Sequence, residues 1–117
     1  MIVHELSVAM NMIEMAESAC VEQGYSRVEA VSIRVGRASG IMRDALVFAF
    51  DCAKAGTLAA DARLDIEDVP LGGACNDCHA EFSVEEAFVF NCPACGGKSF
   101  QITSGQELHI VELEVDS

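Results

Sequence analysis

Four cysteines in the second half of the chain form two CxxC pairs that are 13 residues apart: Cys75, Cys78, Cys92 and Cys95. A CxxC turn directs two thiolates at one metal ion, and its backbone amides support their charge. Four thiolates form a closed tetrahedral shell of the kind that suits structural Zn²⁺. The sequence therefore predicts a four-cysteine zinc site, and a closed site has no open position for chemistry.

Other interpretations of these cysteines exist. Cys75-Asn-Asp-Cys78-His79 has the CxxCH spacing of c-type haem attachment, which gives no role to the second pair. Four sulfurs also suit iron, as in a rubredoxin-type electron carrier, and that alternative stays open. A thiol–disulfide function is less favoured, because one CxxC would suffice. Zinc is preferred, because an insert of about 30 residues cannot bury enough core and needs metal to fold.

A histidine and a glutamate, His4 and Glu5, are adjacent near the amino terminus. Imidazole and carboxylate suit intermediate divalent metals, including Ni²⁺, and a nearby α-amino group adds a nitrogen ligand. The alternative is structural: Glu5 interacts with the positive end of a helix dipole, and His4 is exposed. From the residues alone, the structural interpretation is the stronger one.

The other cysteines and histidines are expected to have structural roles. Cys20 and Cys52 fall on helix faces with apolar neighbours, which predicts two small buried side chains. His79 follows a predicted ligand and is either a supporting group or solvated. His109 shares a strand face with Val111 and is expected to be partly buried.

The periodicity of the chain predicts helices at 5–23 and 43–55 and strands at 28–36, 62–69 and 107–115. The polar residues of the first helix form one narrow stripe, so we expect the helix to be covered on most sides. The fold class is α+β, a small three-stranded sheet with two helices, plus a zinc-ribbon insert. We expect an α+β domain at 1–70 and 106–117 and a zinc-ribbon domain at 71–105.

Composition limits the classes of partner. The 117 residues carry 19 acidic and 7 basic side chains, a formal net charge of −12, which repels phosphate backbones and disfavours nucleic acid. No secretory signal is visible, and the apolar runs are too short to span a bilayer. We expect a cytoplasmic protein without a membrane segment.

Several stretches spread along the chain form one combined pattern: His4-Glu5-Leu6-Ser7, the strand and loop Ile33 to Gly40, the helix around Leu46 to Phe50, the two CxxC pairs, and Val111 to Val115. Over nearly the whole chain this pattern resembles the hydrogenase nickel-incorporation proteins, HypA/HybF. Together these stretches are specific, whereas the CxxC pairs alone are not.

The resemblance implies a nickel metallochaperone and not an enzyme. Its cargo, Ni(II), goes to [NiFe]-hydrogenase and in some organisms to urease. The implied partners are a nickel-handling GTPase and the hydrogenase large subunit, and exchange of the insert would allow a homodimer. By position, His4 and Glu5 correspond to the family's nickel-binding histidine and the acid after it, and the four cysteines correspond to its zinc ligands. The alternative function is a zinc-ribbon adaptor that binds proteins and carries no nickel.

Two residues depart from the family pattern. The family typically begins Met-His-Glu, whereas Ile2 and Val3 precede the histidine here. A hypothesis that restores the pattern is translation from Val3 through a GTG codon. Met42 stands where many members have an acidic residue near the nickel site, and it supplies no hard oxygen ligand. Asp44, two residues later, is a candidate to compensate.

Overall fold

A computed structural model of the chain describes residues 2–117, with side chains described from residue 4 onward. The elements are α1 (Ile2–Glu22), β1 (Arg27–Gly36), α2 (Arg43–Ala53), β2 (Arg63–Val69), β3 (Leu71–Cys75), β4 (Glu81–Val84), β5 (Phe100–Ser104) and β6 (Leu108–Asp116). The chain divides into two compact units. The helical unit comprises the residues up to Ile33, Ile41–Glu67 and His109–Ser117, and the cysteine unit comprises Arg34–Gly40 and Asp68–Leu108.

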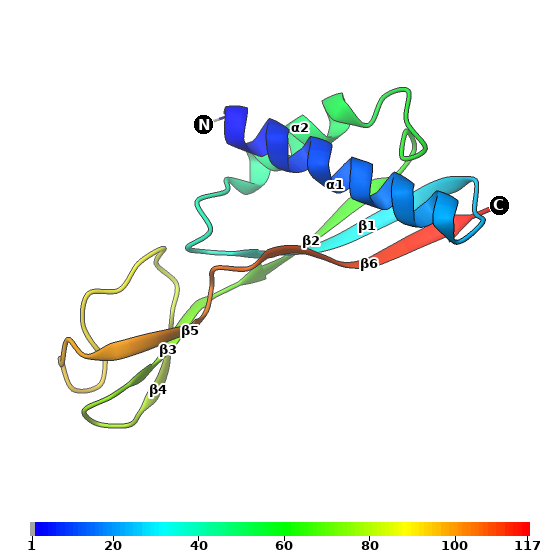
Figure 1. Cartoon of the computed structure of the whole chain (residues 1–117). Helices are drawn as coiled ribbons and strands as arrows, with labels where there is room; N and C mark the ends of the chain where they lie inside the picture. The colour runs from blue at the N-terminus through cyan, green and yellow to red at the C-terminus, as the bar shows by residue number, and fades with distance from the viewer. Residues whose placement is uncertain (1) are drawn as a thin grey trace. The chain divides into compact units, whose positions relative to one another are not determined.

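The helical unit contains both helices and most of a three-stranded sheet with strand order β2-β1-β6. Figure 1 shows both helices on one side of this sheet. The central strand β1 buries Val31, Ile33 and Val35, as the alternating pattern predicts. Phe50 and Leu46 of α2 are also buried, so the core lies between the helices and the sheet. The predicted α+β architecture, two helices on a small sheet plus a cysteine-bearing insert, is confirmed.

Helix α1 buries one face and leaves apolar side chains outside it. The buried residues follow helical spacing along that face: Ala9, Met12, Ile13, Ala16 and Cys20. Met10, Met15 and Val21 are 56%, 60% and 64% exposed, so the prediction that this helix is covered on most sides is wrong. A helix packed on one side of a sheet buries only the stripe that faces that sheet. The helix also begins at Ile2, before the predicted start at residue 5, so His4 lies within it together with Glu5.

The cysteine unit contains a second three-stranded sheet, with β3 between β4 and β5 and both pairings antiparallel. The sequence pattern predicted none of these three strands. Gly72 and Gly73 suggested a break in the strand pattern, but both lie inside β3. Glycine is needed at these positions because the neighbouring strands leave no room for a side chain. A Cβ on Gly73 would lie 2.5 Å from the Gln101 carbonyl oxygen and 2.7 Å from the Phe82 ring. Short polar–apolar alternations, EFSV and FQITS, carried the signal for the flanking strands.

Three burial predictions about individual residues are wrong. Cys52 is exposed, whereas Cys20 is buried as expected. His109 is exposed, and Val111 is 50% exposed. On β6 the buried positions change phase, because Leu108 and Ile110 are half-buried and so are Leu113 and Val115. A single alternation extrapolated along the whole strand therefore assigns His109 and Val111 to the wrong face.

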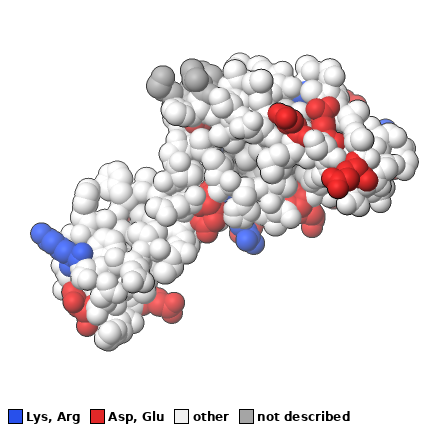
Figure 2. Space-filling view, viewed as in Figure 1, with Lys and Arg blue, Asp and Glu red and all other residues white. Residues whose placement is uncertain are grey.

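The surface is strongly acidic, and in Figure 2 acidic side chains are spread over the face shown while Lys and Arg are few. Within the part of the chain that the structure describes, no helix combines the length and apolar character that crossing a membrane requires.

The loop after β1 packs its backbone closely against the segment before β6. The Gly36 N–H donates to the Glu107 carbonyl over 2.7 Å, and the Ala38 N–H donates to the Gly105 carbonyl over 2.7 Å. A Cβ on Gly36 would overlap the carbonyl group of Gly105. Residue 36 therefore has to be glycine for these two backbones to approach.

We expect Gly36→Ala to lower the free energy of unfolding by about 2–3 kcal/mol, because the added methyl group forces two hydrogen-bonded backbones apart. Urea denaturation of the metal-loaded chain measures the change. Gly40→Ala is the matched control in the same loop. Gly40 has a φ of 82° and open space around it, so only backbone strain of about 1–2 kcal/mol applies there. A smaller loss for Gly36→Ala than for Gly40→Ala would contradict this account of the loop.

Candidate metal centre

The four cysteines of the two CxxC pairs meet in one cluster. Their sulfur atoms all lie within 4.8 Å of one another, with 3.6 Å between Cys75 and Cys95 and 3.8 Å between Cys78 and Cys92. A tetrahedral zinc ion with zinc–sulfur bonds of about 2.3 Å requires sulfur–sulfur distances of about 3.8 Å. The donor set and these two distances fit such an ion. Because all four sulfurs converge, an arrangement in which only the first pair has a role, as in haem attachment, is not favoured.

Backbone amides point at the sulfurs, as predicted for CxxC turns. The Asp77 and Cys78 N–H groups both lie 3.4 Å from the Cys75 sulfur. In the second turn the Ala94 N–H lies 3.4 Å from the Cys92 sulfur, and the Gly97 N–H lies 3.4 Å from that of Cys95. Such donors stabilise negative charge on sulfur, so the turns are built for thiolates.

The proximity of the sulfurs gives the thiols very different pKa values. The hydrogen bond from the Cys78 N–H lowers the pKa of Cys75 to about 7. At Cys95 the Gly97 N–H also acts to lower the pKa, but the Cys75 sulfur and burial outweigh it and raise the pKa to about 12. One thiolate forms readily and disfavours the next, since like charges repel at this distance. A divalent cation removes that repulsion, so the full thiolate form of the cluster requires metal.

The two CxxC turns have the same backbone hydrogen bonds. The His79 N–H donates to the Cys75 carbonyl in the first turn, and the Gly96 N–H donates to the Cys92 carbonyl in the second. Both donors have positive φ, 63° for His79 and 77° for Gly96. Glycine adopts this conformation without strain, whereas a residue with a Cβ is strained by about 1–2 kcal/mol. The His79 side chain is exposed, so of the two roles considered for it, solvation is the one observed.

The structure separates the roles of the amino-terminal pair. His4 is exposed, whereas Glu5 is completely buried. The amide of Met42, the residue at the N-cap position of α2, donates to the Glu5 Oε2 over 3.3 Å. Met42 provides no side-chain cap of its own, and a carboxylate at a helix N-terminus is favoured by the helix dipole. The Glu5 carboxylate therefore interacts favourably with the positive end of the α2 dipole and not only with that of its own helix. The sequence could not indicate this contact between distant residues.

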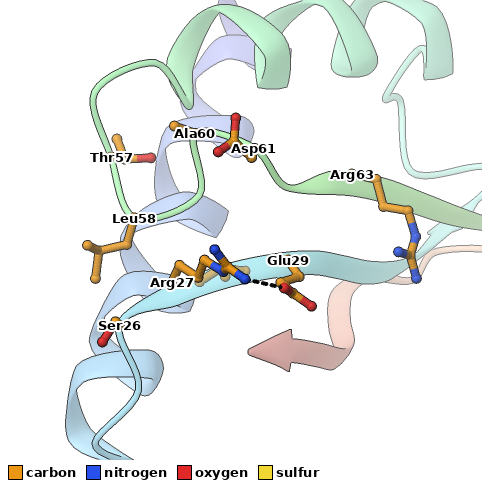
Figure 3. Close-up of a pocket in the computed structure, with 9 residues that line it drawn as sticks. Ser26, Arg27, Glu29, Thr57, Leu58, Ala60, Asp61 and Arg63 are labelled. Carbon is orange, nitrogen blue, oxygen red and sulfur yellow. Dashed lines mark hydrogen bonds and ion pairs between the residues drawn. The ribbon is translucent and has the colours of Figure 1, made fainter. Parts of the chain in front are cut away.

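A separate pocket of about 420 Å³ in the helical unit contains two of the chain's few basic side chains (Figure 3). Arg27 and Arg63 donate hydrogen bonds to neighbouring carboxylates, and these bonds, with that to Asp116 and that to Asp65 first respectively, raise the pKa values of the two guanidiniums. Their charges are therefore compensated within the protein, and the pocket does not suit an anion. The structure pairs each guanidinium with two carboxylates: Arg27 with Glu29 and Asp116, and Arg63 with Asp65 and Glu114.

Residues 3–115 match the family model described as "Hydrogenase/urease nickel incorporation, metallochaperone, hypA". The chain belongs to the HypA family. The family consists of metallochaperones and maturation factors and is not catalytic, as expected from the sequence resemblance. Its function in hydrogenase maturation implies contact with the maturation machinery.

Similar proteins cover almost the whole chain. The hydrogenase maturation factor HypA of Roseiflexus sp. (strain RS-1) is 43% identical over 113 residues, which are 97% of this chain and 92% of that protein. The factor of the same name from Chloroflexus aurantiacus is 43% identical over 111 residues, 95% of this chain and 97% of that protein. The solution structure of the Ni metallochaperone HypA from Helicobacter pylori has a TM-score of 0.68 at 28% identity and covers 97% of each chain.

We expect the cysteine unit to unfold when metal is removed, because metal binding supplies the folding energy of so small a sheet. The core of the helical unit should stay folded. Hydrogen exchange measured before and after chelation should show loss of protection in β3, β4 and β5. Protection of the buried residues of α1 should remain. Cys78→Ser should reproduce the effect, and unchanged protection of β3–β5 after complete metal removal would contradict it.

We expect His79→Gly to raise the free energy of unfolding of the metal-loaded chain by about 1 kcal/mol, because glycine relieves the strain of a positive φ. His109→Gly makes the same chemical change at an exposed position of β6. There it should lower stability by about 0.5–1 kcal/mol, since glycine weakens a strand. Chemical denaturation of the two variants tests the opposite signs, and equal signs would argue against strain at His79.

Proposed function

We propose that this chain binds Ni(II) at the amino-terminal end of α1 and delivers it for maturation of [NiFe]-hydrogenase. The observation that carries the proposal is the family match over residues 3–115, whose description names nickel incorporation. The Helicobacter pylori relative, described as a Ni metallochaperone, supports the same cargo. Urease is a second recipient consistent with the family description.

His4 is the ligand around which we build the nickel site. Its side chain is exposed, so a metal can reach the imidazole without unfolding of the core. An exposed site near a chain end also rearranges easily, which favours transfer of the metal by ligand exchange. Imidazole nitrogen is a suitable ligand for Ni²⁺.

Glu5 is the second residue assigned to this site, and its side chain has a competing contact. If nickel binds at Oε2, it competes there with the hydrogen bond that the Met42 amide donates over 3.3 Å. Nickel binding through Glu5 would then also change the start of α2. This coupling makes the contribution of the side chain measurable at Met42.

The four-cysteine cluster is proposed to hold Zn(II) as a structural ion in the cysteine unit. A sulfur-only tetrahedral set suits zinc, and the amides directed at the sulfurs stabilise the thiolates. Iron in the same cluster would give a coloured protein after aerobic purification, so a colourless sample with one zinc per chain excludes the electron-carrier alternative.

The proposal includes the partners that this function needs, a nickel-handling GTPase and the hydrogenase large subunit, in the cytoplasm. A homodimer is also compatible with it. The alternative function, a zinc-ribbon adaptor without nickel cargo, predicts no nickel affinity and no effect of changes at His4.

We expect His4→Ala to abolish specific Ni(II) binding while zinc stays at one per chain, because the imidazole is the principal nickel ligand. Isothermal titration with Ni(II), together with metal analysis, measures both quantities. His109→Ala is the matched control, since His109 is also exposed and lies on β6. Nickel binding by His4→Ala that equals that of the parent would rule out the proposed site.

The same titration on Glu5→Gln examines the second residue. Glutamine keeps the shape of the side chain and removes its charge. If the carboxylate coordinates nickel, affinity falls and the Met42 amide of the parent exchanges faster with solvent when nickel is added. Unchanged nickel affinity in Glu5→Gln would restrict Glu5 to its contact with α2.

A further inference from the structure

Two phenylalanines in the loop between β4 and β5 lie on the surface of the cysteine unit. We call residues 85–91 the aromatic loop. Phe88 is 64% exposed and Phe90 is 74% exposed, and their ring centroids are 5.3 Å apart at an interplanar angle of 55°. The unit's other two phenylalanines, Phe82 and Phe100, are half-buried and pack edge to face against each other. The exposed pair is therefore additional to the packing that holds this sheet together.

The exposed pair borders a shallow groove of about 590 Å³. Its apolar walls include Val84, Phe88, Phe90 and Pro93, and Glu86 is the charged residue among those that line it. No lysine or arginine lines the groove within the described residues. An exposed apolar surface favours binding of another molecule. The neighbouring carboxylate favours a partner that carries positive charge.

Both ends of the aromatic loop are held in place. At its start, the Arg37 guanidinium donates to the Glu85 carbonyl oxygen over 3.3 Å and lies 3.3 Å from the Glu85 carboxylate. At its end, Cys92 belongs to the four-sulfur cluster. A loop that is fixed at both ends loses less conformational entropy when a partner binds. Metal bound in the cluster would therefore also hold the end of the aromatic loop in place for binding.

We propose that the aromatic loop and its groove dock a segment of another protein in which apolar side chains alternate with arginine or lysine. The apolar side chains fill the groove, and a guanidinium group can stack on the face of Phe88 or Phe90. Aromatic side chains, phenylalanine included, are also enriched in the cores of protein interfaces.

Charge argues against a second copy of this chain as the occupant. Each copy carries a net charge of −12, and the groove itself presents a carboxylate. Two such surfaces repel each other, whereas a basic segment is attracted. The proposal goes beyond nickel binding and does not depend on it, because none of these residues belongs to the amino-terminal site.

A titration of the full-length, zinc-loaded chain with short synthetic peptides tests the proposal by NMR. The probe is a peptide of alternating arginine and leucine. One comparison peptide has glutamate in place of arginine, and another has serine in place of leucine. We expect the arginine–leucine peptide to bind at least about tenfold more tightly than either of the others, with shifts confined to residues 84–96.

The double variant Phe88→Ser/Phe90→Ser should weaken binding of the arginine–leucine peptide at least about tenfold. Phe48→Ser is the matched control, because Phe48 is 62% exposed on α2 of the helical unit, and it should leave binding unchanged. Zinc content and nickel titration of each variant verify that both metal sites are intact. This also separates failure of docking from failure of the nickel proposal.

Three results would overturn the proposal. The first is equal affinity for the arginine–leucine and glutamate–leucine peptides. The second is equal affinity of the double variant and the parent for the arginine–leucine peptide. The third is a concentration-dependent dimer in sedimentation that the double variant abolishes, which would assign the groove to a second copy.

Discussion

The convergence of four thiols within 4.8 Å is the constraint on which the cysteine unit depends. A thiolate at one of these sulfurs disfavours charge on its neighbours, and the pKa of Cys75 is lowered while that of Cys95 is raised. The turns supply amide donors for thiolates, so the backbone is already organised for metal. The three short strands of this unit have a core that is too small to be stable by itself, and a metal bound by the four sulfurs would join the two CxxC turns.

A second constraint is local to the start of the chain. Glu5 is completely buried, and its carboxylate accepts a hydrogen bond from the Met42 amide. This bond connects the first turn of α1 to the start of α2. His4, its neighbour in sequence, is exposed. One adjacent pair thus contains a side chain held by the fold and a side chain open to solvent.

Periodicity predicted both helices, the three strands of the first sheet and the buried Val31, Ile33 and Val35 of β1 from local sequence alone. It failed where a neighbouring segment decides the outcome. The strands of the insert are short, and Gly72-Gly73 suggested a break, although the approach of Phe82 and Gln101 is what requires glycine there. Cys52 lies on a helix with apolar neighbours, but the stripe of α2 that faces the core does not include it.

The sequence by itself determined the two CxxC turns, because this spacing fixes two sulfurs and their amide donors within one turn of backbone. It also determined the family, through motifs spread along the whole chain. It also predicted that the two turns meet in one cluster, as they do. Only the tertiary structure decided that Glu5 contacts Met42 and that Phe88 and Phe90 remain uncovered. The physical reason is that local patterns specify which face of an element is apolar. What covers that face depends on residues that are distant in the chain.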